Sequence, residues 1–466
     1  MARLCRALWL LLVIGLVVTV NSLPGKAAAT AASLQELIDR AQPGETVVVP
    51  AGAYPGPIRV TKPIILQGHG NVEVNSTNKE PVLVIQADHV TVRGMRIVDK
   101  RINEPDASLV VRGSYTVLEH LTIETMGTGV QLIQSDHNTL KDIAIIGGVS
   151  EPDDDTEENM LDHSQHKLLA PKKTGPKPQK GNGINLDRSH YNQLTSNRIG
   201  NMFDGIYLEN SNFNEIEQNF VEKSRYGYHF MGTADTKLVG NTGSANVTGA
   251  MLMETTRAIV RENRFVKQRE NPNSQGVLLF DVTHSHIENN LIEGNRVGFF
   301  MEQSSLNFFS ANRLEKNFIG MQLKEAARNE IAANQFISNV IQAQAQDGKE
   351  NLLEGNYWDT MQGIDLDADG HSDVPYEMNP FFLALTGAVP PYQLFFQAPG
   401  FVFLEGLFSS GTGTVIRDAR PLITPGKEIM AAAGQSRPEQ QGWIMGISAC
   451  LLALTGFGIY MGVRQK

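Results

Sequence analysis

The feature that most limits the possible folds is a glycine that recurs almost every 22 residues. The segments that it opens begin at Gly183, Gly205, Gly227, Gly249, Gly276, Gly298 and Gly320, and every step is 22 residues except one of 27. An earlier member begins at Gly129. Eleven residues after each glycine comes a second apolar residue, namely Leu140, Leu194, Ile216, Leu238, Val260, Ile287, Phe309 and Ile331. Two short apolar segments per repeat, joined by Asn-rich turns, predict the coil of a β-solenoid.

The predicted fold is an all-β, right-handed parallel β-helix with coils of about 22 residues. Side chains alternate along a strand, so the first and third positions after each glycine point inward and the second and fourth face solvent. Near the N-terminus, Ser33 can cap a short amphipathic helix that carries Leu34 and Ile38 on one face. We expect this helix to cover the open end of the solenoid.

The two ends of the chain predict export and membrane attachment. Residues 1–29 have the layout of a signal peptide, with an apolar run from Ala7 to Val20, although an uncleaved anchor is the alternative. Residues 442–463 are uncharged and predict a C-terminal transmembrane helix. Basic residues flank both segments, so the body is expected outside the cytoplasmic membrane, in the periplasm or on the cell surface.

Between these ends, changes in composition divide the chain further. The β-helix is predicted over residues 30–378 and is interrupted by a charged insertion loop at 151–180. An apolar capping or docking segment follows at 379–408, and a polar linker at 409–441.

Charge and cysteine content restrict the partners. The net charge of -10 argues against nucleic acid, which needs a basic surface. Both cysteines, Cys5 and Cys450, lie in the apolar ends, so a metal in the body must be held by His, Met or oxygen ligands.

One group of outward positions departs from the polar pattern. His229 and Met231 occupy one coil, and Met251 and Met253 occupy the next. Imidazole and thioether groups on adjacent coils, about 4.8 Å apart, predict a Cu(I) site. With the flanking Tyr207, Leu278, Phe280 and Phe300, the same patch could instead dock a protein partner. A third interpretation is ordinary packing beneath the insertion or the tail.

An Asp-rich segment near the end of the repeats predicts a second metal site. Asp365, Asp367, Asp369 and Asp373 stand at positions one, three, five and nine of a loop with Gly370 at position six. This spacing is typical of the front of a calcium loop, although Tyr376 replaces the expected glutamate at position twelve. A weak calcium site is favoured over a polar turn.

The usual enzymes on such a scaffold, polysaccharide lyases and hydrolases, need clustered outward carboxylates with a basic partner. Asp187 and Glu209 are adjacent outward carboxylates, but no Arg or Lys shares those positions in the neighbouring coils. No catalytic residue is therefore assigned.

The sequence from about Ser33 to Phe408 resembles the NosD family. The resemblance is carried by Leu34-Gln-Glu-Leu with Pro43-Gly44 and Gly52-Ala-Tyr54, by Tyr228-His229-Phe-Met231, by Gly249-Ala-Met-Leu-Met253, and by Gly355-Asn-Tyr-Trp358 with the Asp-rich loop through Pro375-Tyr376. The insertion at 151–180 and the C-terminal helix depart from the family pattern.

The resemblance implies a non-enzymatic periplasmic protein of denitrification that helps mature the copper centres of nitrous oxide reductase. Its implied partners are an ABC transporter, with ATPase and permease, a copper chaperone and the reductase. The alternative is a cell-surface β-helix that binds or cleaves carbohydrate. Neighbouring genes for a transporter and a copper reductase would favour the first function, and genes for sugar use the second.

Overall fold

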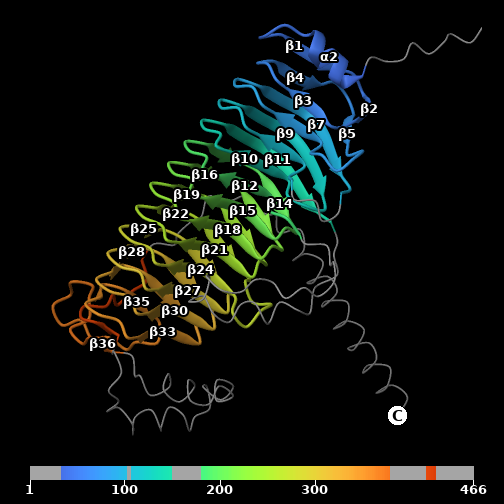
Figure 1. Cartoon of the computed structure of the whole chain (residues 1–466). Coiled ribbons are helices and arrows are strands. Elements are labelled where there is room, and N and C mark those ends of the chain that lie inside the picture. The colour runs from blue at the N-terminus through green and yellow to red at the C-terminus, as the bar shows by residue number, and fades with distance from the viewer. Residues whose placement is uncertain (1–32, 102–105, 149–179, 378–415, 427–466) are drawn as a thin grey trace, which may run out of the picture.

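The computed structural model describes residues 33–101, 106–148, 180–377 and 416–426. Within these ranges the protein is a parallel β-solenoid, in which one sheet of 12 strands and one of 25 strands wind around a common core (Figure 1). Parallel strands joined by crossovers take the right-handed sense. The predicted all-β solenoid is therefore confirmed. None of the described helices has the length and apolar character needed to span a membrane.

The 12-stranded sheet, called sheet B, forms one face of the solenoid. Each of its strands pairs in parallel with the equivalent strand of the next coil. In order, the strands are β3 (Ile58–Val60), β6 (Leu83–Ile85), β8 (Leu109–Val111), β10 (Val130–Ile133), β12 (Ile184–Asp187), β15 (Asp204–Glu209), β18 (Tyr226–Met231), β21 (Thr248–Met253), β24 (Gln275–Phe280), β27 (Val297–Glu302), β30 (Ile319–Lys324) and β33 (Ile341–Gln346).

The 25-stranded sheet, called sheet A, forms the other two faces. Three long strands run across both of them and join them into one sheet, namely β7 (Thr91–Asp99), β9 (Val117–Thr125) and β11 (Thr139–Gly147). The first face also contains β1 (Thr46–Val49), β4 (Ile65–Gly68), β13 (Gln193–Thr195), β16 (Glu215–Glu217), β19 (Lys237–Val239), β22 (Ile259–Arg261), β25 (His286–Glu288), β28 (Phe308–Ser310), β31 (Glu330–Ala332) and β34 (Leu352–Glu354).

The second face of sheet A repeats the same arrangement. It contains β2 (Gly52–Pro55), β5 (Val72–Asn75), β14 (Arg198–Gly200), β17 (Phe220–Glu222), β20 (Thr242–Ser244), β23 (Arg264–Val266), β26 (Leu291–Glu293), β29 (Arg313–Glu315), β32 (Gln335–Ile337) and β35 (Tyr357–Trp358). Near the C-terminal end, β36 (Tyr376–Glu377) pairs antiparallel with β37 (Arg417–Asp418), which also adds to β34.

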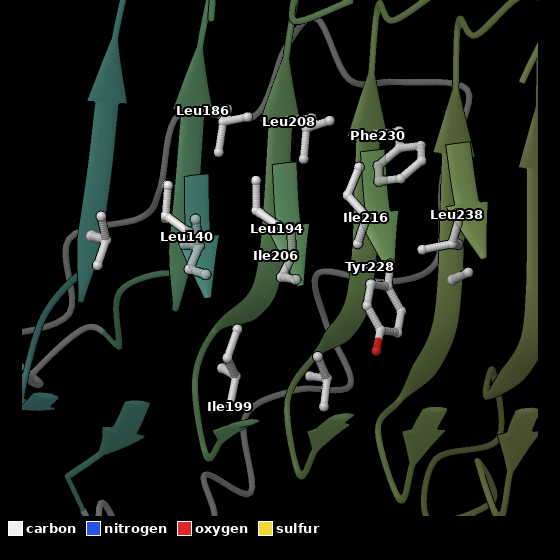
Figure 2. Packing of buried hydrophobic residues seen from close by; sticks show 14 of the residues in the cluster. Leu140, Leu186, Leu194, Ile199, Ile206, Leu208, Ile216, Tyr228, Phe230 and Leu238 are labelled. Atoms are coloured by element: carbon white, nitrogen blue, oxygen red, sulfur yellow. The ribbon is translucent and has the colours of Figure 1, made fainter. Parts of the chain in front are cut away.

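The inward side chains form one continuous core along the solenoid axis. Figure 2 shows Leu186, Leu208 and Phe230 stacked in one column, and Leu140, Leu194, Ile216 and Leu238 in another. The second apolar residue of every coil, predicted eleven residues after the glycine, is fully buried. The repeat glycine itself is required by close approach, because a Cβ on Gly227 would lie 2.5 Å from the carbonyl oxygen of Gly249.

Buried asparagines stack in a ladder at the corner between the two faces of sheet A. Each side-chain amide donates to the side-chain oxygen of the next asparagine, at 2.9–3.1 Å, from Asn197 through Asn219, Asn241, Asn263, Asn290, Asn312 and Asn334 to Asn356. The left-handed turn conformation belongs to the residue before each ladder position, such as Ser196 and Gln218. Asparagine is therefore required at these positions because its side-chain amide both donates and accepts hydrogen bonds, and not because asparagine tolerates a positive φ.

Both ends of the solenoid are closed by side chains that satisfy backbone groups. The predicted helix is observed as α2 (Leu34–Arg40), and the Ser33 hydroxyl accepts from the Glu36 amide at 3.2 Å. Gln35 of α2 bonds both the N–H and the carbonyl of Arg59 on the end strand β3. At the other end, the carboxylate of buried Asp418 accepts from the backbone N–H groups of Gly355 and Asn356, and also from the Asn356 side-chain amide and the Trp358 indole.

Several predicted segments fall mainly or wholly outside the described residues. These are the signal peptide (1–29), the insertion loop (151–180), the apolar segment (379–408) and the transmembrane helix (442–463). Within the predicted linker, residues 416–426 are described and meet the last coils, where Ile416 joins the core. The strands β10 and β12 on either side of the insertion pair directly, so the coil register continues across it.

The in-and-out register can be tested on one strand. Leu194 is fully buried whereas its neighbour Gln193 is exposed. We expect Leu194→Asp to destabilise the protein by roughly 4 kcal/mol or more, or to prevent folding, because it buries an unpaired charge. Gln193→Asp should stay within about 0.5 kcal/mol of the parent. Similar melting temperatures for the two variants would contradict this register.

Candidate metal centre

The methionine patch forms a second apolar cluster, separate from the core, on the outer side of sheet B. It consists of Tyr226, Met251, Met253 and Leu278, with Met231, Phe280 and Phe300 packed against them. The pairing of β18 with β21 sets His229 opposite Met251 and Met231 opposite Met253. The predicted alternation therefore holds, since these side chains leave the sheet away from the core and lie together on adjacent coils.

The expectation that the patch faces solvent is wrong. Met251 is 0 % exposed, Met253 3 % and His229 4 %, while Met231 is half-buried. Among the predicted docking residues, Leu278 is buried, and Tyr207, Phe280 and Phe300 are half-buried. Alternation fixes the side of the sheet from which a side chain leaves, but not what covers that side. The burial of these side chains agrees with the packing interpretation. Whether the patch can bind a metal therefore depends on the polar groups around His229.

A buried carboxylate that the sequence analysis overlooked holds the histidine. Asp204 Oδ2 lies 2.9 Å from His229 Nδ1, and the Arg225 guanidinium donates two bonds to Asp204 at 2.8 and 2.9 Å. Arg225 is also held over the rings of Phe203 and Tyr226. The Asp204 carboxylate therefore has a fixed cationic partner inside the protein.

Asp204 stands one residue before its repeat glycine and Arg225 two residues before the next one, at positions that the alternation from the glycine does not sort. The strands β15 and β18 begin at Asp204 and Tyr226, so Asp204 and Tyr226 form an additional outer column of sheet B, and Arg225 immediately precedes it. Inspection of the two residues before each repeat glycine would have revealed an acid, Asp204, before Gly205 and a base, Arg225, before Gly227 on the next coil. The overlooked signal was thus the pair Asp204 and Arg225.

The contact with Asp204 determines which nitrogen of His229 is available. Burial raises the pKa of the Asp204 carboxyl, but hydrogen bonds from His229 and Arg225 outweigh this effect, and the resulting pKa lies below the ordinary 3.8. An ionised carboxylate can only accept, so Nδ1 carries a hydrogen, and in the neutral imidazole the lone pair is then on Nε2. His229 Nε2 is buried and has no hydrogen-bond partner within the part of the chain that the structure describes.

This arrangement fits a soft metal ion. Histidines that bind metal usually give their other ring N–H to a carboxylate, as His229 does to Asp204. The cluster adds the thioether of Met251, which lies opposite His229, and that of Met253, two residues further along β21. Imidazole with thioether is the donor set that suits Cu(I).

The Asp-rich loop is brought together only in part. Asp365, Asp367 and Asp373 each present an oxygen within 4.8 Å of the others. Asp369 does not join them, because its carboxylate accepts from the His371 amide and pairs with Arg420 at 2.5 Å. The predicted four-residue set is thus reduced to three carboxylates, which can still offer oxygen ligands to calcium.

The outward carboxylates considered for an enzyme do not form a free pair. Asp187 is bound in a fork by its neighbour Arg188, at 3.0 Å for both bonds. Glu209 is half-buried beside Met231, its partner on β18.

Residues 161–365 match a family model described as "Periplasmic copper-binding protein (NosD)". This match confirms, over that part of the chain, the resemblance noted in the sequence. A comparison with curated proteins found no match.

Solved structures that resemble this chain include an epimerase module, a polygalacturonase and a surface adhesin. The A-module of mannuronan C-5 epimerase AlgE6 from Azotobacter vinelandii is 13% identical, with 67% of this chain and 85% of that chain covered and a TM-score of 0.47. The family 28 exopolygalacturonase of Yersinia enterocolitica is 10% identical (68% and 74% covered, TM-score 0.46). PfbA, a surface adhesin of Streptococcus pneumoniae, is 12% identical (66% and 82% covered, TM-score 0.41). These likenesses carry no inference about function.

The lowered pKa of Asp204 predicts how its contribution to stability depends on pH. A carboxylate with a depressed folded-state pKa stabilises the fold above its unfolded pKa of about 3.8, and this contribution is lost as the pH falls through the folded-state pKa. The melting temperature of Asp204→Asn should therefore lie below that of the parent by a constant gap from about pH 7 to 5, and the gap should shrink below about pH 4. A gap that stays constant down to about pH 2 would contradict the assignment.

The three-carboxylate loop can be tested with calcium. Calcium at about a hundred times its Kd should add about 2.7 kcal/mol to the stability of the fold and raise its melting temperature. Asp367→Asn should remove this response, whereas Asp369→Asn, which only breaks the pair with Arg420, should keep it. If calcium leaves the parent unchanged, the loop is a polar turn.

Proposed function

We propose that this chain is a NosD-like accessory protein that handles Cu(I) outside the cytoplasm during maturation of the copper centres of nitrous oxide reductase. The observation that carries the proposal is the buried Nε2 of His229, which has no hydrogen-bond partner among the described residues, on the strand next to the buried thioethers of Met251 and Met253. The family model that matches residues 161–365 is described as periplasmic and copper-binding, which supports the same role.

In this proposal copper is cargo, and three side chains hold it. His229 supplies Nε2, and Met251 and Met253 supply thioether sulfur. Asp204 fixes the ring of His229 and its tautomer, and Arg225 balances the charge of Asp204. Because the donors are neutral and shielded from water, the site favours a monovalent ion over a divalent one, whose burial costs more.

The partners are proposed from the resemblance to NosD. They are an ABC transporter with its ATPase and permease, a copper chaperone and the reductase. Attachment to the membrane by residues 442–463 and export by residues 1–29 are part of the same proposal. A cell-surface β-helix that binds or cleaves carbohydrate is the alternative function.

The proposal predicts that Cu(I) binding depends on the three donors. We expect the triple variant His229→Gln, Met251→Leu and Met253→Leu to lose at least about a hundredfold in Cu(I) affinity, measured by competition with a chromogenic chelator. These changes nearly conserve side-chain volume, so the fold should survive. In cells, the same variant should fail to mature the reductase.

A matched control uses methionines of the core. Met301→Leu and Met321→Leu make the same chemical change at fully buried inward positions. They should leave Cu(I) affinity unchanged. Full reductase activity in cells that contain normal amounts of the folded triple variant would exclude the patch from the function.

A further inference from the structure

One contact at the edge of the methionine patch concerns how tightly copper would be held. The hydroxyl of Tyr207 donates to the thioether sulfur of Met231, with an O–S distance of 3.5 Å. The ring of Tyr207 packs against His229, with centroids 4.8 Å apart and planes tilted by 42°. The pairing of β15 with β18 fixes these neighbours, because it sets Tyr207 opposite His229 and Glu209 opposite Met231.

The hydroxyl is kept as a donor by its surroundings. The phenolic O–H of Tyr207 has a single hydrogen, and among the described residues its acceptor within hydrogen-bond distance is the sulfur of Met231. A neutral phenol is a poor ligand for Cu(I), so Tyr207 is not expected to bind the metal itself. Its effect on the site must therefore act through Met231.

A thioether sulfur binds a metal through a lone pair. A lone pair that accepts a hydrogen bond is less available for a metal ion. Met251 and Met253 are fully or almost fully buried beside His229, whereas Met231 is half-buried and tied to Tyr207. The fourth soft donor of the patch is therefore already engaged by a protein group.

We propose that Tyr207 is a positioning residue that keeps Met231 out of the copper ligand set, so that the site holds Cu(I) through three donors and can release it. This inference rests on the copper-handling role proposed above. A site with a free fourth donor would bind more tightly and release more slowly, which suits storage. A three-donor site leaves one position open for an incoming ligand from the acceptor protein.

The test is Tyr207→Phe, which removes the hydroxyl and keeps the ring against His229. Releasing a sulfur from one neutral hydrogen bond should tighten Cu(I) binding by roughly three- to tenfold. It should also slow transfer of Cu(I) to a competing chelator by a similar factor. The matched control is Tyr226→Phe, since that ring also touches His229, at 4.9 Å, but belongs to a different column of the sheet.

A double-mutant cycle connects the effect to Met231. In the parent, Met231→Leu should change Cu(I) affinity less than twofold, because this sulfur is not a ligand. In the Tyr207→Phe background, Met231→Leu should abolish the gain.

The outcomes separate the two proposals. If the parent binds Cu(I) through His229, Met251 and Met253 but Tyr207→Phe leaves its affinity unchanged, the inference about Tyr207 is wrong and the proposed function stands. A gain that survives Met231→Leu also overturns the inference, because the hydroxyl then acts through another group, such as Glu209. If the parent does not bind Cu(I) at all, the proposed copper site fails, and the inference fails with it.

Discussion

The constraint on which the rest of the structure depends is the constant register between successive coils. Hydrogen bonds of a parallel sheet require equivalent residues to stack, so each coil must return the chain to the same place one strand spacing further along. The asparagine ladder enforces this at one corner, because each buried amide must meet the next. A change in coil length is tolerated only in a turn, as between Met251 and Leu278, which pair although they are 27 positions apart.

The same register creates the candidate metal centre. Residues distant in sequence become neighbours only because β15, β18 and β21 lie in successive coils, so that Asp204, His229 and Met251 come from three different repeats. Each coil alone carries only part of the site. The rigid sheet supplies the positioning, and Asp204 and Arg225 supply the orientation of the histidine.

Much of this was predictable from the sequence. The repeat glycines and the apolar residue eleven positions later indicated the coil, and alternation separated Leu208 in the core from Tyr207 outside it. The burial of Met251 could not be predicted, because it depends on what covers the sheet. Asp204 was overlooked because it precedes the repeat glycine. Asp369 was assigned to the calcium loop from its spacing alone. Its partner Arg420 is 51 residues away and belongs to no repeat, so this ion pair could not be foreseen.

The asparagine ladder also has a direction. Each asparagine of the ladder donates one amide hydrogen to a backbone carbonyl of the preceding coil and the other toward the C-terminal end, to the next side chain. The last side-chain acceptor is Asp418, a carboxylate that has no hydrogen of its own to pass on. If a second solenoid were placed end to end with this one, the ladder of side-chain hydrogen bonds could not continue into it, because the Asp418 carboxylate donates no hydrogen bond. The final coil would otherwise offer the repeating edge on which fibres grow. Asp418 thus ends the side-chain ladder at the last described coil.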